Sequence, residues 1–387
     1  MQKKIIALAV AGLASTAAFA QSNVTIYGSL DAGYTYRWDA ENKTTGQHSR
    51  SSIDSGSSAG NRLGFKGVED LGNGLKAVFL LEQGFNFDSG TQGQGGRMFG
   101  RQAYAGLTGG FGTAVAGRMY TPYYTFVAGL DPFAAGTVGS YRNVWGNTGS
   151  TKAAGATSAN NLIDPTRVDN AVAYVSPNFG GFDVTVAYSN AASVDDNVSA
   201  VTNEDNGDNS KNNTVYGILA KYAGAGATVG FNVHRIAAQS TVANTTLKTL
   251  DNYTLGGSYD FKVVKLSAVA AYSIWDTSLS QGDASLSNYM VGATVPVGKF
   301  NLKASVNYSD FNGDARNTLR GQATQYAFGA DYNLSKRTNF YAAYSLIDAN
   351  TARSSTIYGV GDATNNGVAA ASNPFQQGLT MGLRHQF

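Results

Sequence analysis

The residues best placed to do chemistry in this sequence are three arginines, Arg62, Arg101 and Arg167. Each stands at the start of a segment in which apolar and polar residues alternate, directly after a long polar connection. Side chains of a β-strand point alternately to opposite faces, so each arginine lies opposite the apolar side chains of its segment. Because a guanidinium stays protonated at any workable pH, the pattern predicts a permanent row of positive charge.

The face of each arginine follows from its apolar neighbours. Lys66 has the same parity as Arg62 and belongs to the same polar face. Two interpretations of this polar face stay open. The charged side chains could merely keep the enclosed space hydrated, or they could form a row of positive charge at a constriction. The residues expected on the opposite, apolar face are Leu63 and Phe65 beside Arg62, Tyr104 beside Arg101, and Val168, Val172 and Tyr174 beside Arg167.

Other kinds of chemistry find little support. His48, His234 and His385 are scattered, and no serine–histidine–acid spacing or metal-ligand cluster stands out, although distant residues could still meet in space. The chain has no cysteine, which excludes disulfides and thiolate chemistry. The stretch "NEDNGDNSKNN" offers oxygen ligands that suit calcium, but it lacks an ordered spacing and is better explained as a solvated loop. We therefore predict no enzyme, no metal and no cofactor.

The elements that position these arginines are strands. In "NLKASVNYSD", Leu302, Val306 and Tyr308 share one face, while Lys303 and Ser305 share the other, as expected for a strand between two different environments. Sixteen segments show such alternation: 24–37, 62–69, 75–87, 101–107, 111–119, 167–175, 182–189, 214–222, 227–236, 252–261, 264–275, 287–296, 300–310, 324–334, 338–347 and 378–387.

The connections between these segments alternate in length. Every second one is a tight turn such as "TGG", "AGAG" or "VGK", whereas the others are long and polar, such as "DAENKTTGQHSRSSIDSGSSAGN". A soluble sandwich has no reason to place every long connection at one end. Short turns on one side, long loops on the other and an even strand count are typical of an outer-membrane barrel. Phenylalanines that open segments after short turns fit one of its two aromatic girdles: Phe111, Phe182, Phe300 and Phe340.

Composition supports this fold class. Only 14% of the residues are charged, against about 25% in typical soluble domains. No apolar run after the N-terminus approaches the ~18 residues of a spanning helix. Sixteen strands enclose a lumen too wide for side chains to fill, which leaves an aqueous channel. The sequence thus predicts an all-β, sixteen-stranded antiparallel transmembrane β-barrel with short periplasmic turns and long external loops.

The first twenty residues have a separate role. Lys3 and Lys4 precede a short apolar run that ends in the A-x-A sequence at residues 18–20, which is typical of a secretory signal peptide. We therefore expect residues 21–387 to form the barrel domain. The full chain has 28 basic and 26 acidic residues; without Lys3 and Lys4 the counts are 26 and 26, so the mature charge is about zero. Nothing in this balance suggests a nucleic-acid partner.

The longest connection, about residues 119–166, differs from the other loops. It contains "MYTPYYTFVAGLDPFAAGTVGSYRNVWG", which is rich in aromatic and small residues. A loop in water has no need of Tyr120, Tyr124 or Phe126, whereas a loop folded into the barrel would pack them against its wall. Loops of this length are usually functional. We expect it to narrow the channel, with Asp131 facing the arginines.

Several motifs give the chain a family resemblance. The stretches "VTIYGSLDAGY", "RLGFKGVEDLGNGLKAVFLLEQGF" and "RQAYAGLTGGFGTAVAGR", together with the ending "GLRHQF", resemble the trimeric general porins of Gram-negative bacteria, in particular their betaproteobacterial branch. The resemblance spans residues 21–387. It implies a homotrimer whose third loop narrows each pore, with Arg62, Arg101 and Arg167 on the wall facing acidic loop residues, and Arg118 beside the loop base. It also implies that the terminal Phe387 is read by the barrel-assembly machinery.

One departure from the family pattern bears on charge. The enteric porins have proline and then glutamate after the loop aspartate, whereas here Asp131 and Pro132 are followed by Phe133. This removes a carboxylate and favours a positive constriction. We therefore expect a passive, weakly anion-selective channel for small hydrophilic solutes and ions, in contact with outer-membrane lipid and lipopolysaccharide. The alternatives are a porin that prefers organic anions, an outer-membrane barrel enzyme such as a lipase or protease, and an adhesin.

Overall fold

The computed structural model describes residues 23–42, 47–145, 166–192, 213–237, 241–242, 245–277, 284–312, 321–349 and 375–387. The expected signal peptide lies outside these described residues, as do residues 203–212 of the acidic stretch. No helix in the described part of the chain has both the length and the apolar character needed to cross a membrane.

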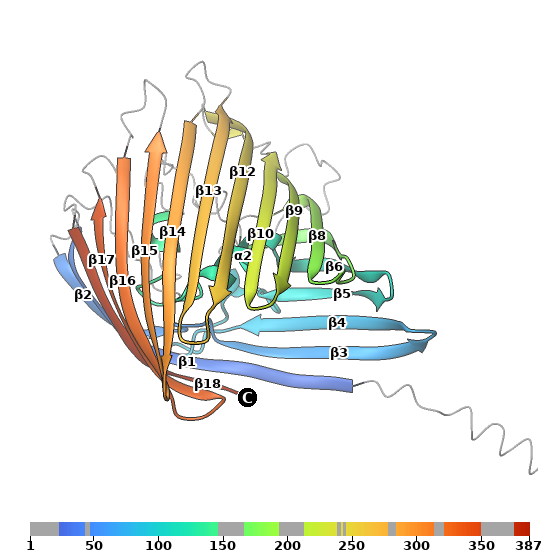
Figure 1. Cartoon of the computed structure of the whole chain (residues 1–387), viewed down its shortest axis with the longest axis horizontal. Coiled ribbons are helices and arrows are strands. Elements are labelled where there is room, and N and C mark those ends of the chain that lie inside the picture. Colours follow the sequence, from blue (N-terminus) through green and yellow to red (C-terminus); the bar gives the residue numbers. More distant parts are fainter. Residues whose placement is uncertain are drawn as a thin grey trace, which may run out of the picture.

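Antiparallel strands dominate the structure (Figure 1). Short helical segments, η1 (Gln94–Gly96), α2 (Pro122–Leu130) and α3 (Arg142–Trp145), lie in two of the connections. The strands are β1 (Asn23–Asn42), β2 (Gln47–Ser55), β3 (Arg62–Gly72), β4 (Leu75–Gly84), β5 (Gln102–Gly109), β6 (Gly112–Tyr120), β7 (Arg167–Val175), β8 (Phe182–Ala192), β9 (Asn213–Gly224), β10 (Ala227–Ala237), β11 (Thr241–Val242), β12 (Thr245–Asp260), β13 (Lys265–Thr277), β14 (Ala284–Val297), β15 (Phe300–Asn312), β16 (Gly321–Asn333), β17 (Thr338–Ala349) and β18 (Phe375–Gln386).

The sheet closes on itself because the first and last strands pair. The register between β1 and β18 runs from Ser29 opposite Gln386 to Trp38 opposite Gln377. On its other edge β1 pairs with both β2 and β3, which therefore act as one broken strand. The two-residue β11 pairs with β12 beside the connection from β10. Counted in this way, sixteen strands form the closed antiparallel barrel, and the prediction of the fold class is confirmed.

The broken strand differs from the sequence prediction. Residues 47–55 were expected to lie in a long external loop, but they form β2 and continue the barrel wall beyond β3. Ile53 is the one apolar residue in "QHSRSSIDS", so the segment lacks the alternation by which a strand is recognised. Its strand geometry comes from backbone pairing with β1 rather than from burial.

The two faces of the wall have opposite chemistry. Leu302 and Val306 of β15 are 47% and 43% exposed on the outside, whereas Ser305 and Asn307 on the inside are buried. A soluble sheet would bury its apolar side chains instead. Since every backbone N–H and C=O in a bilayer must pair internally, a closed barrel with an apolar exterior matches lipid as its outer solvent.

The connection between β6 and β7 folds into the barrel, where α2 lies inside the curved wall (Figure 1). Its apolar side chains form a core cluster with residues of the wall, and Tyr123, Val127 and Trp145 are fully buried. This cluster explains why the loop is rich in aromatic residues. The helix begins at Pro122, with Thr121 as N-cap: its Oγ1 accepts a hydrogen bond from the backbone N–H of Tyr124.

Glycines on the inner wall receive the side chains of this loop. A Cβ atom added at Gly230 would lie 2.7 Å from the ring of Phe126, and one at Gly256 would lie 2.8 Å from Leu130. Pro132 and Phe133 occupy the corresponding spaces at Gly292 and Gly329. These glycines leave space on the inner wall, and the side chains of the loop pack into it.

Candidate functional site

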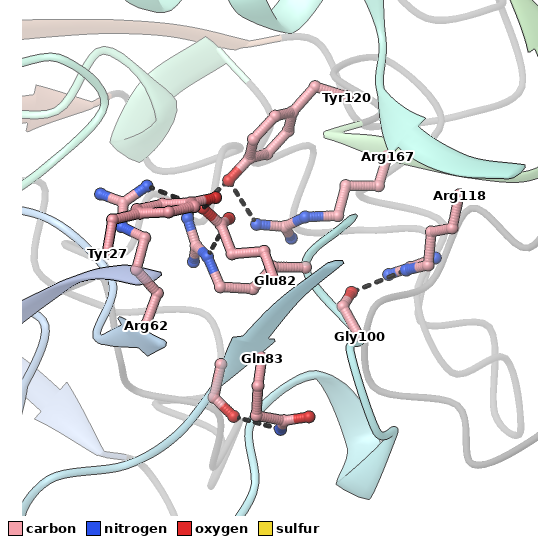
Figure 2. Close-up of polar contacts among 10 residues, drawn as sticks. Tyr27, Arg62, Glu82, Gln83, Gly100, Arg118, Tyr120 and Arg167 are labelled. Carbon is pink, nitrogen blue, oxygen red and sulfur yellow. Dashed lines mark hydrogen bonds and ion pairs between the residues drawn. The ribbon is translucent and has the colours of Figure 1, made fainter. Parts of the chain in front are cut away.

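Arg101 and Arg167 meet at the phenol of Tyr120. The guanidinium of Arg101 donates to Tyr120 Oη at 2.5 Å, and that of Arg167 donates to the same oxygen at 3.0 Å. The Arg167 guanidinium also lies over the Tyr120 ring, 4.6 Å from its centroid. Two guanidinium groups from separate parts of the wall therefore converge on one residue at the base of the inward loop. Figure 2 shows Arg167 directed at the phenol of Tyr120.

A carboxylate balances part of this charge. Arg101 Nε lies 2.8 Å from Glu82 Oε1, and Arg62 Nη1 lies 3.8 Å from Glu82 Oε2. Tyr27 donates its hydroxyl to Glu82 at 2.9 Å, and Lys66 lies 5.4 Å from the centroid of the Tyr27 ring. We refer to Arg62, Arg101, Arg167, Tyr120 and Glu82 as the arginine cluster.

Sequence reasoning missed Glu82, although a signal for it exists. A carboxylate within a spanning strand must face the lumen, because facing lipid is costly. The strand register places Glu82 opposite Gly64 of β3 and Gln102 of β5, next to the strand positions of the first two arginines. An acidic residue in a strand that lies between two arginine-bearing segments therefore predicts an ion pair in the lumen.

Arg118 belongs to a neighbouring group. Its Nε donates to the carbonyl oxygen of Gly100 at 2.6 Å, and its Nη1 lies 2.5 Å from Asp169 Oδ1. Arg97, in the connection before β5, binds the other oxygen of Asp169 at 2.8 Å. Figure 2 shows the Arg118 guanidinium directed to Gly100 rather than to Tyr120. Arg97 and Asp169 were not predicted. Their ion pair holds the connection between β4 and β5 against β7.

Two expected orientations are wrong. Tyr104 was expected on the outer face, but Gln102 pairs with Glu82 and Tyr104 follows two residues later, so Tyr104 shares the inner face of Glu82. Arg101 lies just before β5 and reaches the same side from outside the regular alternation.

Val168 was also expected on the outer face, but it is 2% exposed and packs in an apolar cluster with Met119. The register between β6 and β7 shifts between Gly117 and Met119, and Asn170 takes a left-handed conformation with φ +49°. This bulge breaks the strict alternation at the start of β7, whereas Val172 beyond it is exposed as expected.

Asp131 has a local role in the loop. Its carboxylate accepts backbone N–H groups from Phe133 and Ala135, each at 3.0 Å, and from Tyr141 at 3.4 Å. Burial raises the pKa of Asp131 to about 6, against the lowering effect of these hydrogen bonds. The carboxylate is thus turned toward the backbone of its own loop, and the structure does not bring it to the arginine cluster. Tyr124, by contrast, stacks on Tyr120 with ring centroids 5.2 Å apart.

The loop tip is fastened to the break between β2 and β3. The backbone N–H of Thr137 donates to the carbonyl oxygen of Ser57. The break itself is held by Asp31, whose carboxylate accepts the backbone N–H groups of Ser58 and Ala59 at 3.0 and 2.8 Å and the hydroxyl of Tyr341 at 2.6 Å. The broken strand therefore provides the docking point for the loop.

The charge of the arginine cluster is positive. Three arginines face one carboxylate, and among them the Arg62 side chain is more open than that of Arg101, at 24% exposed against 9%. Among the described residues, no three His, Cys, Asp or Glu side chains gather in a way that could hold a metal ion. The arrangement can attract and guide anions through a wet passage.

Comparison with known proteins agrees with this architecture. The sequence model of a family described as Gram-negative porin matches residues 7–352. The chain is 32% identical to outer membrane porin protein 32 of Delftia acidovorans over the whole of both chains. It is also 32% identical to an outer membrane porin protein of Bordetella pertussis, covering 88% of this chain and 93% of that protein. The solved anion-selective porin from Comamonas acidovorans superposes with a TM-score of 0.75 at 26% identity, covering 95% of this chain and 100% of that one.

Proposed function

The chain belongs to the family of Gram-negative porins, and on that premise we propose that its pore is weakly selective for small anions. The protein is a β-barrel of the outer membrane and a passive channel, not an enzyme. Its solutes are small, hydrophilic molecules and ions that pass according to their size and charge. Channel selectivity of this kind arises from pore width and from the charges that line it.

The observation that carries the proposal is the imbalance of charge at the arginine cluster. Arg62, Arg101 and Arg167 contribute three positive charges, and Glu82 compensates one of them. Asp131 adds no counter-charge there, because its carboxylate is held by the backbone of its own loop. The Comamonas relative is described as anion-selective, which supports the same sign for this chain.

The expected magnitude is modest. One unit charge about 8 Å from an ion in water changes the ion's energy by about 0.5 kcal/mol, roughly twofold for each ion and fourfold for the anion-to-cation ratio. Screening over roughly 8–10 Å at physiological salt weakens the effect further. A small surplus of arginines therefore gives a preference for anions rather than exclusion of cations.

The proposal extends to assembly. Residues 1–20 act as a signal peptide, and residues 21–387 form the mature barrel, which assembles as a homotrimer in contact with outer-membrane lipid and lipopolysaccharide. Phe387 serves as the recognition signal for the barrel-assembly machinery. Its position supports this role: its backbone N–H and C=O pair with Gly28 at the seam where β18 meets β1.

Planar-bilayer recording of the purified protein tests the proposal. We expect a steady aqueous conductance and, in a potassium chloride gradient, a reversal potential displaced toward that of chloride. A displacement toward the potassium potential would contradict the anion selectivity. A strong block by one organic anion at low concentration would instead favour a substrate-preferring porin.

A further inference from the structure

A further arginine, on the inward loop rather than on a strand of the wall, contacts the arginine cluster through two stacked aromatic rings. Arg142 begins α3 in the inward loop, and its guanidinium lies 5.8 Å from the centroid of the Tyr124 ring. Tyr124 stacks on Tyr120 with an interplanar angle of 27°, and Arg167 lies over Tyr120. Loop and wall are thus connected by a column of planar groups with a guanidinium at each end.

The surroundings of Arg142 hold it in a defined place. The amide of Gln325 on β16 donates to the carbonyl oxygens of Gly139 and Ser140, at 2.8 and 3.1 Å, immediately before α3. The residues that flank Arg142 are fully buried, including Tyr141 and Val144. Arg142 itself is only half-buried. It is therefore a half-buried cation on an anchored turn, with its guanidinium over the ring of Tyr124.

We propose that Arg142 is a selectivity-determining residue of the pore, a loop-borne cation seated on Tyr124 that extends the positive charge of the arginine cluster onto the loop. The inference rests on the proposed anion selectivity. It adds that the loop side, and not only the wall, attracts anions.

The role of Tyr124 in this arrangement is to position the charge. A guanidinium over an aromatic face is attracted by the negative face of the ring, and a planar ring also restricts the orientation of a long, flexible side chain. Without the ring, the charge of Arg142 remains but its position spreads over more of the loop surface. Loss of Tyr124 should therefore weaken the electrostatic effect without abolishing it.

The absence of cysteine from the whole chain makes a decisive test possible. Arg142→Cys introduces a single thiol, and the reversal potential is measured in a potassium chloride gradient before and after labelling of channels already inserted in the bilayer. We expect the substitution to lower the chloride-to-potassium permeability ratio by roughly two- to fourfold. A positively charged methanethiosulfonate reagent should restore the ratio, and a negatively charged one should lower it further. Because the same folded channel is compared before and after labelling, a folding defect cannot produce this pattern.

Matched variants complete the experiment. Arg337→Gln removes the same charge from an exposed position in the short turn between β16 and β17, and should leave the ratio near that of the wild type. Tyr124→Leu should lower the ratio by less than the loss of Arg142, and the double variant should match the loss of Arg142 alone, since the ring acts through the arginine.

Two failures are distinguishable. If the wild type is anion-selective but both reagents leave the ratio of Arg142→Cys unchanged, Arg142 has no role in selectivity and the inference is overturned. If the wild type is itself cation-selective, the proposed function fails; the response of Arg142→Cys to the two reagents still decides whether Arg142 acts on permeating ions.

Discussion

Arg101 and Glu82 form a buried ion pair between neighbouring parts of the barrel wall, with Arg101 Nε 2.8 Å from Glu82 Oε1. The same carboxylate lies 3.8 Å from the more open Arg62. One acidic residue thus stabilises two like charges that would otherwise repel each other, and the positive surplus remains with the groups that face the lumen.

The first prediction concerns this carboxylate. Glu82→Gln keeps the shape of the side chain but removes the single negative charge of the cluster, so the chloride-to-potassium permeability ratio should rise roughly two- to fourfold. The variant should also lose thermal stability, because buried arginines lose their partner. Glu69→Gln, at an exposed position on β3, removes an equal charge and should change neither quantity appreciably.

The second prediction concerns the docking of the loop tip. A Cβ atom at Gly136 would overlap the carbonyl oxygen of Ser58, so Gly136→Ala should push the loop tip off the break between β2 and β3. We expect noisier single-channel current and altered conductance. Gly129→Ala is the matched control, because a Cβ atom at Gly129 has open space within 4 Å. Equal current noise in the two variants would show that this contact does not hold the loop.

The third prediction is a pH dependence that originates at Asp131. Its folded-state pKa is raised to about 6 from the ordinary value of 3.8, so between these values the folded loop holds a proton that the unfolded chain has released. The stability contribution is therefore fully present below pH 4, decreases as the pH rises through 6 and is constant above that. The loss amounts to at most about 3 kcal/mol.

Hydrogen exchange of the loop amides measures this effect. After correction for intrinsic rates, protection of residues 133–141 in the wild type should be greater at pH 4 than at pH 7. Asp131→Asn cannot titrate and should remove the difference. A pH dependence that is the same in both proteins would assign the effect to other groups.

The fourth prediction concerns the barrel seam. Deletion of Phe387 should lower the amount of heat-resistant trimer in the outer membrane, with little change in the conductance of the trimers that do form. The ring of Phe387 lies over Gly28 on β1, so Phe387→Tyr, which keeps the ring, should assemble normally. Wild-type amounts of trimer after the deletion would refute a role of Phe387 in assembly.

Much of the barrel could be predicted because lipid imposes a simple rule. A strand with lipid on one side and water or packed polar groups on the other must alternate, as "NLKASVNYSD" does, and tight turns must separate such strands at one end. The rule fails where the environment differs. The strand β2 has one apolar residue, Ile53, and so resembles a loop in sequence. Val168 lies beside a bulge at Asn170 and departs from the parity of its neighbours.

The site was less readable for a related reason. Arg62, Arg101 and Arg167 could be assigned to the lumen because a charge has few other places in a membrane wall. Inside the lumen, however, no periodic pattern tells which polar groups pair, so Asp131 was expected at the arginines although it caps its own loop. Contacts such as those of Tyr120 and Arg142 depend on how the inward loop folds. The loop has no periodic pattern, so the spacing of its residues does not predict these contacts.

The measurement that tests the central claim most directly is the reversal potential, in a potassium chloride gradient, of the wild type, Arg62→Ser and Arg62→Ser/Arg167→Ser. If the arginine cluster sets selectivity, the wild type favours chloride and each substitution lowers the chloride-to-potassium ratio further, by roughly fourfold or less per charge, while the heat-resistant trimer is retained. Identical reversal potentials in all three proteins would show that these arginines do not control the permeating ions.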